Sequence, residues 1–257
     1  MILLDPKLVN IKESLLFDID NKARSIFRAI TFCKKTSSKS LLDAFINSTN
    51  SLTQLLSIKN AQMEAETEED LIEYQANLNK TILFVIGEIK NEIPFESQVQ
   101  LFQIFRLISP QSHQKHPNKY RNTLVQIGRL ICPDPNQLNG LVSQLFVNLK
   151  QLKHPLLKAI YLHHELIRIH PFVDGNGRIV RIAKNWILMY NLYPPIFIKD
   201  EAEKIEYIRS LSESFEKMYD KPGLWHKETE RFFMEELNRV LLSIDYIHDK
   251  LKESGSY

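Results

Sequence analysis

Twelve residues in the C-terminal half of the chain combine side chains that suit phosphoryl transfer. The segment from 170 to 181 reads His-Pro-Phe-Val-Asp-Gly-Asn-Gly-Arg-Ile-Val-Arg. His170 is the only group in it that accepts a proton well near neutral pH. Arg178 and Arg181 are three residues apart, so both can bind phosphate oxygens from one side of a helix. Asp174 suits Mg²⁺, which binds one or two carboxylates together with phosphate oxygens.

These groups must be positioned by two helices joined at a glycine loop. Apolar residues follow helical spacing over 154–168 and again over 179–193, where Pro194 and Pro195 end the run. The N–H groups and positive dipole end of the second helix then face the loop, which is a common way to hold phosphate. Gly175 and Gly177 permit positive φ angles and the close approach of an anion. The residues predict transfer of a nucleotide's phosphoryl group to an acceptor whose proton His170 removes.

Segment 170–181 resembles the signature of the Fic family, His-x-Phe-x-Asp/Glu-Gly-Asn-Gly-Arg-x-x-Arg, and matches it at every defined position. The resemblance implies a mainly α fold, a Fic-type helical bundle with a short β-hairpin flap over the active site. It also implies AMPylation, in which ATP and Mg²⁺ deliver AMP to a Ser, Thr or Tyr hydroxyl of a target protein and pyrophosphate leaves.

The resemblance also assigns roles to residues of this chain. His170 would be the general base, Asp174 the Mg²⁺ ligand and Phe172 a core anchor for the loop. Tyr207 stands where relatives often carry paired tyrosines near the adenine, and Ser214 stands where many carry an asparagine. The nucleotide-binding set is Gly175, Asn176, Gly177, Arg178, Arg181 and Tyr207, with the two arginines on the β- and γ-phosphates.

A second segment, 120–135, is similar to the Fic flap. Its β-branched residues and its Gly- and Pro-containing end predict a short hairpin rather than a helix. In the family the flap holds the target segment by strand pairing. The expected docking residues are Leu124, Val125, Gln126 and Ile127.

One family feature is expected to be missing. Many Fic proteins inhibit themselves with a helix reading Ser/Thr-x-x-x-Glu-Gly/Asn, whose glutamate pairs with the second arginine of the signature. No glutamate in this chain is followed by Gly or Asn. The nearest N-terminal match places Lys59 at the glutamate position, where it would repel Arg181, and the match around Glu216 lacks the final residue. The sequence therefore predicts no intramolecular inhibition of the usual kind.

Other functions stay open or are disfavoured. Relatives with this fold transfer UMP or phosphocholine, remove AMP or phosphorylate, and a non-catalytic nucleotide-regulated interaction module is a further alternative. Gly177 and Arg178 argue against phosphorylation, and an intact His170 and Asp174 argue against a pure binder. The run His163-His164-Glu165 begins like a zinc protease helix, but Arg168 replaces its second histidine. A Walker phosphate loop has no match.

Composition indicates an ordinary helical protein. The 257 residues carry 33 basic and 31 acidic side chains, a net charge of +2, which favours neither nucleic acid nor membrane as a partner. Two cysteines, Cys33 and Cys132, suit a reducing compartment, so the expected location is the cytoplasm, with delivery into a host cell left open. The expected partners are a target protein with an acceptor hydroxyl and, left open, a separate antitoxin or self-association.

Three segments are predicted along the chain: an N-terminal helical region over 1–95, a Fic catalytic core over 96–220 and a C-terminal helix over 221–257. Helices are expected over 8–32, 41–57 and 68–93, with a polar connector at 36–40. Thr67 is expected to cap the third of these. Two more helices are expected over 203–252, broken at 221–223.

Overall fold

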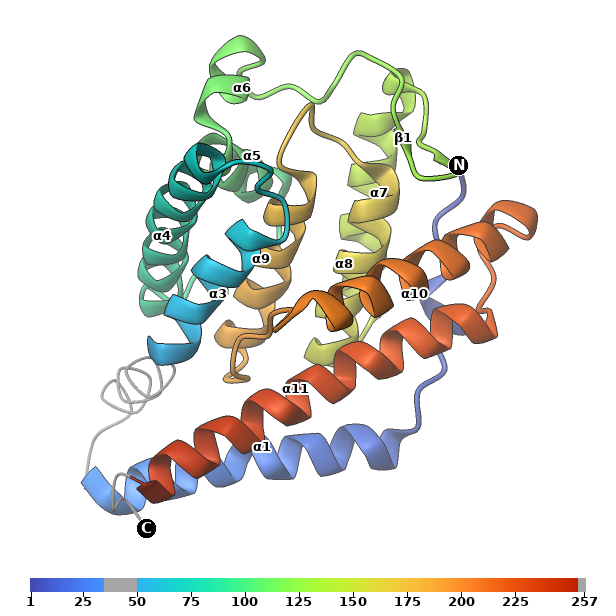
Figure 1. Ribbon diagram of the computed structural model, residues 1–257. Coiled ribbons are helices and arrows are strands. Elements are labelled where there is room, and N and C mark those ends of the chain that lie inside the picture. The colour runs from blue at the N-terminus through green and yellow to red at the C-terminus, as the bar shows by residue number, and fades with distance from the viewer. Residues whose placement is uncertain (35–49, 254–257) are drawn as a thin grey trace.

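A computed structural model describes residues 1–34 and 50–253, and within them the protein is built almost wholly of helices (Figure 1). The α-helices are α1 Glu13–Lys34, α3 Asn50–Gln62, α4 Glu68–Lys90, α5 Gln98–Ile108, α6 Pro110–Lys115, α7 Leu138–Gln151, α8 Pro155–Ile169, α9 Asn176–Tyr190, α10 Glu201–Asp220 and α11 Lys227–Glu253. Short 3₁₀ turns span Pro6–Leu8 and Pro135–Gln137, and the strands are β1 Gln126–Ile127 and β2 Leu130–Ile131. The prediction of a mainly α fold with one hairpin is confirmed.

Helices α8 and α9 form the centre of the molecule and pack against each other more extensively than any other pair. Every side chain of α8 from Ala159 to Ile169 is buried, and so is every side chain of α9 from Arg178 to Met189. A helix covered on all sides must be surrounded by other elements. Helices α7 and α11 contact α8, while α3, α4 and α5 contact α9. The loop between α8 and α9 is thereby held by two buried helices.

The N-terminal half differs from the prediction at helix ends. Helix α1 begins at Glu13 rather than at residue 8, because Asp5 caps a separate 3₁₀ turn over Pro6–Leu8. Helix α3 runs on to Gln62, five residues past the expected end, while the expected start at 41 and the connector at 36–40 lie outside the described residues. Helix α4 begins at Glu68 as predicted. Thr67 and Asp70 form a capping box there.

The predicted hairpin lies at one end of the bundle, near the N-terminus (Figure 1). Its strands are antiparallel, with Gln126 opposite Ile131 and Ile127 opposite Leu130. Gly128 has a φ of +55°, which the first position of a tight two-residue hairpin turn requires. Strand β2 contacts α10, so the hairpin covers the space between α10 and the α8–α9 loop.

The C-terminal part forms two long helices, α10 and α11, separated near Lys221 as predicted. Helix α11 lies alongside α1 at the lower edge of Figure 1, so the beginning and end of the described chain share one layer. None of the helices in the described residues is long and apolar enough to cross a membrane. The division at residues 95 and 220 stays a prediction.

Candidate active site

The loop between α8 and α9 has left-handed backbone at both ends. His170 caps α8 with φ 49° and ψ 61°, and Gly175 precedes α9 with φ 73°. A Cβ at Gly175 would lie 2.5 Å from Oγ of Ser109, so glycine is required for space as well as for backbone angle. Asn176 fixes the loop between them, because its side chain accepts from Phe172 N at 2.9 Å and donates to Phe172 O at 2.8 Å.

Phe172 anchors this loop in the core, where the resemblance places it. Its side chain is 1% exposed and stacks on Phe105, with ring centroids 4.5 Å apart. Phe102 and Tyr120 contact its ring edge-on. The buried aromatic cluster therefore fixes the position of the loop that carries His170 and Asp174.

A cavity of about 950 Å³ opens between this loop, the hairpin and α10. Its volume is at the upper end of the range typical of ligand sites. Seven of the predicted catalytic, nucleotide-binding and metal-binding residues lie on its wall: His170, Asp174, Gly175, Asn176, Gly177, Arg181 and Tyr207. Of the expected docking residues only Ile127 lines it, while Leu124 lies outside with 70% of its surface exposed.

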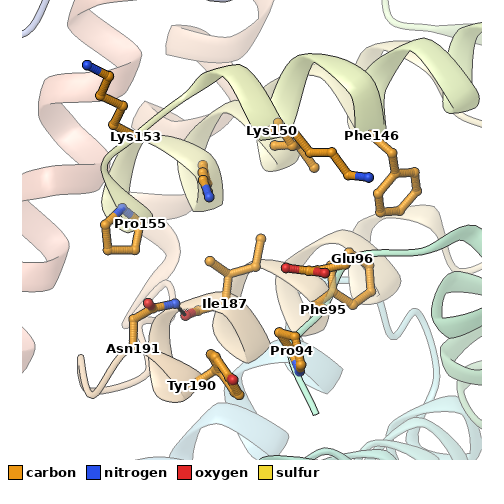
Figure 2. A pocket seen from close by; sticks show the side chains of 12 residues that line it. Pro94, Phe95, Glu96, Phe146, Lys150, Lys153, Pro155, Ile187, Tyr190 and Asn191 are labelled. Atoms are coloured by element: carbon orange, nitrogen blue, oxygen red, sulfur yellow. Dashed lines mark hydrogen bonds between the residues drawn. The ribbon is translucent and has the colours of Figure 1, made fainter. Parts of the chain in front are cut away.

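A second cavity, of about 150 Å³, lies between the ends of α7 and α9 (Figure 2). Phe95 and Phe146 lie on its apolar side, Lys150 extends toward Phe146, and Lys153 points away. It contains no predicted site residue and is small for a nucleotide. The larger cavity is therefore the candidate active site.

His170 is held in its neutral form. Burial and the positive charge of Arg121 lower its pKa to about 4, and the Ile167 backbone and the negative charges of Glu64 and Asp174 only partly offset these effects. The imidazole is consequently neutral at physiological pH, which is the form that acts as a base. Its side chain lies on the wall of the large cavity beside the α9 N-terminus.

The prediction of no intramolecular inhibition rested on the absence of a glutamate that pairs with the signature arginines, and this basis is wrong. Glu64, two residues after the end of α3, lies 2.6 Å from Nη2 of Arg181 and 2.9 Å from Nε of Arg178. Asn60, one turn earlier on α3, accepts from Nε of Arg181. Lys59, which was expected at the glutamate position, comes five residues too early.

The missed signal was a relaxed form of the family pattern. Asn60 and Glu64 have the Ser/Thr-x-x-x-Glu spacing, with an amide in place of the hydroxyl and Ala65 in place of Gly or Asn. An amide oxygen, like a hydroxyl, can accept a hydrogen bond from arginine, and Asn60 does so here. Glu216, the carboxylate of the other partial match, instead pairs with Arg129 of the hairpin at 3.7 Å.

Arg178 lies behind the cavity rather than on its wall. Its side chain is 2% exposed, its guanidinium carbon is 3.7 Å from the Tyr74 ring centroid, and its Nη2 contacts Asp174 at 3.2 Å. Arg181 does line the cavity. Both arginines therefore contact Glu64, but Arg181 faces the cavity, while Arg178 lies behind it and also contacts Asp174.

Asp174 offers a divalent cation a single carboxylate, so the other ligands must come from water and from the phosphates of a substrate. Its side chain is 47% exposed toward the cavity, while Ser109 Oγ and Gly175 N donate to it at 2.9 and 2.6 Å. Among the described residues, no three His, Cys, Asp or Glu side chains gather as a self-contained metal site. A single half-exposed carboxylate fits Mg²⁺, which keeps most of its ligands from water and phosphate.

Tyr207 forms part of the cavity wall and is fixed from behind. Its hydroxyl lies 2.8 Å from Nε2 of His163, and burial raises its pKa. His163 in turn faces Glu236, which also accepts from Lys184 at 2.6 Å. A buried network thus holds the ring. Ser214 lies apart from the cavity, fully buried between His164 and Thr229.

Arg121 is a second residue to which the sequence assigned no role. Its guanidinium is buried and donates to the His170 carbonyl at 2.7 Å. The same guanidinium contacts the carbonyls of Thr123 and Pro133, one on each side of the hairpin. It stands in the flap-like segment, but nothing in its sequence neighbourhood marks its partners, which are main-chain carbonyls between 2 and 49 residues away.

Comparison with known proteins identifies similar chains. Residues 95–188 match the sequence model of the Fic/DOC family. The chain is similar to "Protein adenylyltransferase Fic" of Culex quinquefasciatus, 31% identical over 158 residues that cover 60% of this chain and 32% of the relative. Its counterpart in Nematostella vectensis is 26% identical over 219 residues, covering 79% and 51%. The chain thus spans about a third to a half of the length of these curated relatives.

A solved structure also resembles this one. A Fic domain containing signaling protein from Bacteroides thetaiotaomicron VPI-5482 superposes with a TM-score of 0.67. The match covers 88% of this chain and 96% of that one at 18% sequence identity. At this identity the likeness concerns the fold, and the fold it supports is the helical bundle with a hairpin at one end.

Proposed function

Because this chain belongs to the Fic family, we propose that it is a protein adenylyltransferase. In this reaction the hydroxyl oxygen of a target Ser, Thr or Tyr attacks the α-phosphorus of ATP. The bond between the α-phosphorus and the bridging oxygen breaks, and pyrophosphate leaves. The observation that carries the proposal is the neutral His170 beside the α9 N-terminus, on the wall of a cavity large enough for a nucleotide.

His170 takes the proton of the attacking hydroxyl. A base with a pKa of about 4 is unprotonated at neutral pH and so is available in every molecule. A correctly placed general base contributes roughly 10²–10⁴-fold to a rate. The remainder comes from positioning and from neutralising the phosphate charge.

The phosphates are held by the first turn of α9 and by Arg181. The first N–H groups of a helix have no partner within it and point outward with the positive end of the dipole. Gly175 and Gly177 leave room beside them. Asp174 would hold Mg²⁺, and the bound ion supplies further positive charge to the phosphates. We expect Tyr207, on the cavity wall, to lie beside the adenine.

The target lies along the hairpin. The outer edge around Leu124 to Ile127 has exposed or half-exposed side chains and one strand partner, β2, so its free edge can pair with an extended target segment. Such pairing uses main-chain groups and places one target side chain over the cavity. The acceptor is a hydroxyl on that side chain.

Glu64 competes with ATP in this proposal. Its carboxylate already uses the donors of Arg181 and Arg178, and a phosphate needs Arg181. The enzyme is then weakly active until Glu64 moves. A segment of the 1–95 region thus regulates the core in the same chain, and a separate antitoxin is not required for inhibition.

Transfer of label from ATP tests the function. Purified protein, Glu64→Gly and the Glu64→Gly/His170→Ala double variant are incubated with α-³²P-ATP and Mg²⁺, with and without cell lysate. The expected result is labelled protein with Glu64→Gly and none with the double variant. A Glu64→Gly/His226→Ala variant, altered at a surface histidine on the α10–α11 connection, is the matched control and keeps the label.

Three results would contradict the proposal. Label from γ-³²P-ATP instead of α-³²P-ATP indicates phosphorylation. Label that survives His170→Ala removes the base from its role. No label with any variant, while ATP still binds by calorimetry, indicates another nucleotide donor or a binding module.

A further inference from the structure

Arg121 occupies the junction between the catalytic loop and the hairpin, and its contacts are unusually concentrated. Three consecutive carbonyls leave the C-terminal end of α8, those of Ile169, His170 and Pro171. Arg121 meets all three: Nη2 donates to Ile169 O at 3.4 Å, Nε to His170 O at 2.7 Å and its own backbone N to Pro171 O at 2.8 Å.

The same guanidinium holds both sides of the hairpin. Nη1 donates to Thr123 O at 2.6 Å, before β1, and Nη2 donates to Pro133 O at 2.7 Å, after β2. These two carbonyls bracket the segment expected to dock the target. One planar group with five donors in fixed directions therefore sets the catalytic histidine and the hairpin relative to each other.

The charge of Arg121 is also unusual. The side chain is 2% exposed, and in the described part of the chain its acceptors are all carbonyl oxygens, with no carboxylate at ion-pair distance. A buried charge without a counterion in contact is costly. Here the negative end of the α8 dipole, at the Ile169 and His170 carbonyls, and the more distant charge of Asp134 compensate it. The carbonyls at the end of α8 thus hold Arg121 in this position.

We propose that Arg121 is a positioning residue, which aligns His170 with the hairpin edge that presents the acceptor hydroxyl. This inference rests on the proposed role of His170. It assigns Arg121 no contact with ATP, because Arg121 does not line the cavity. Its loss leaves the nucleotide site intact and separates the base from the target.

Arg168 provides a matched control. It is also an arginine with 2% exposure, close to the same end of α8. Its Nη2 donates to Ile2 O and to Glu165 at 3.1 Å, so it ties the N-terminal segment to α8 instead of the hairpin. Replacing either arginine by glutamine removes one buried charge, and the two variants differ in which segment they release.

The first test is hydrogen–deuterium exchange without nucleotide, so its result does not depend on AMP transfer. Arg121→Gln should speed exchange at least tenfold over residues 121–133, where Cys132 N bonds Val125 O, and leave residues 2–5 protected. Arg168→Gln should do the reverse. Equal loss of protection in both segments with both variants overturns the proposal. If Arg121→Gln does not fold, Arg121→Lys is measured instead, because one ammonium cannot span the two sides of the hairpin.

The second test is kinetic, in the Glu64→Gly background. Arg121→Gln should lower kcat for label transfer roughly 10- to 100-fold, as expected for displaced reacting groups, with the KM for ATP unchanged. Arg168→Gln should lower the melting temperature and leave kcat unchanged. A fall in kcat with Arg168→Gln of the same size, or a rise in the KM for ATP with Arg121→Gln alone, overturns the positioning role. If Glu64→Gly itself transfers no AMP, the proposed function fails and the exchange result still stands.

Discussion

The Oε1 oxygen of Glu64 lies 2.6 Å from Nη2 of Arg181, and a Cβ at Gly177 would lie only 2.2 Å from the same oxygen. The carboxylate therefore stands over the first turn of α9, beside the arginine that faces the cavity. This is where a helix N-terminus binds an anion. Glu64 occupies, in the same chain, the position proposed for a phosphate.

Glu64→Gly should raise ATP affinity. The carboxylate accepts a charge-assisted hydrogen bond from Arg181, the arginine that a phosphate needs, and such a bond is worth roughly 1.5–3 kcal/mol. Since about 1.4 kcal/mol is a tenfold change, we expect ATP to bind on the order of 10- to 100-fold more tightly by calorimetry. Glu66→Gly, an exposed neighbour, is the control and should change nothing. Equal affinity of both variants would show that Glu64 does not compete with ATP.

Gly177→Ala tests whether the space beside Gly177 is where the phosphates bind. In the Glu64→Gly background the added methyl group would lie 2.9 Å from Nη1 of Arg181, in the space proposed for phosphate. We expect ATP affinity to fall at least tenfold relative to Glu64→Gly alone. Gly140→Ala on α7 meets nothing within 4 Å and should leave binding unchanged while stabilising the helix by up to about 1 kcal/mol. Unchanged affinity with Gly177→Ala places the phosphates elsewhere.

The rate should not fall near pH 6.5, where an ordinary catalytic histidine becomes protonated. The pKa of His170 is lowered to about 4 by burial and Arg121, against the raising effect of Glu64 and Asp174, so the base stays unprotonated well below pH 6.5. We expect kcat/KM of Glu64→Gly to stay level between pH 7.5 and 5.5. The negative charge of Glu64 raises the pKa of His170, so the Glu64→Gly variant should have a His170 pKa that is at least as low. A tenfold fall over this range, with the protein still folded by fluorescence, contradicts a buried neutral base.

Acid should destabilise the fold through its buried histidines. Burial lowers the pKa of His163 to about 3, with Lys184 adding to the effect, and that of His170 to about 4. In the unfolded chain each histidine binds a proton near pH 6.5, whereas in the folded chain it does not. The free energy of unfolding is therefore highest above pH 6.5 and decreases as the pH falls below it. Between pH 7.5 and 5.5 each histidine should lower the free energy of unfolding by about 1.4 kcal/mol.

Urea unfolding at several pH values measures this loss. His163→Gln should make the decline between pH 7.5 and 5.5 shallower by about 1.4 kcal/mol, the contribution of one group. His226→Gln, at the surface, should reproduce the slope of the parent protein. A parent slope that His163→Gln leaves unchanged means that His163 titrates normally.

The arrangement of helix, glycine loop and helix around residues 170–181 was predictable from the sequence. Apolar residues that recur with a period of about 3.6 predict the two helices, and the glycines permit the turn between them. The Thr67 cap and the hairpin at Gly128 follow from equally local rules. The chemistry of His170 and Asp174 could be named because their residue types and their spacing limit what they can do.

Only the tertiary structure shows that Glu64 meets Arg181 and that Arg121 holds His170. Glu64 is 117 residues from Arg181 along the chain, and Arg121 is 49 residues from His170. Their pairing depends on how α3 packs against α9 and on where the hairpin returns to the end of α8. Those placements follow from the packing of whole helices, and partners such as the carbonyls of Thr123 and Pro133 carry no side-chain signal. Local physical chemistry thus determines the elements and the reactive groups, while packing decides which charges meet.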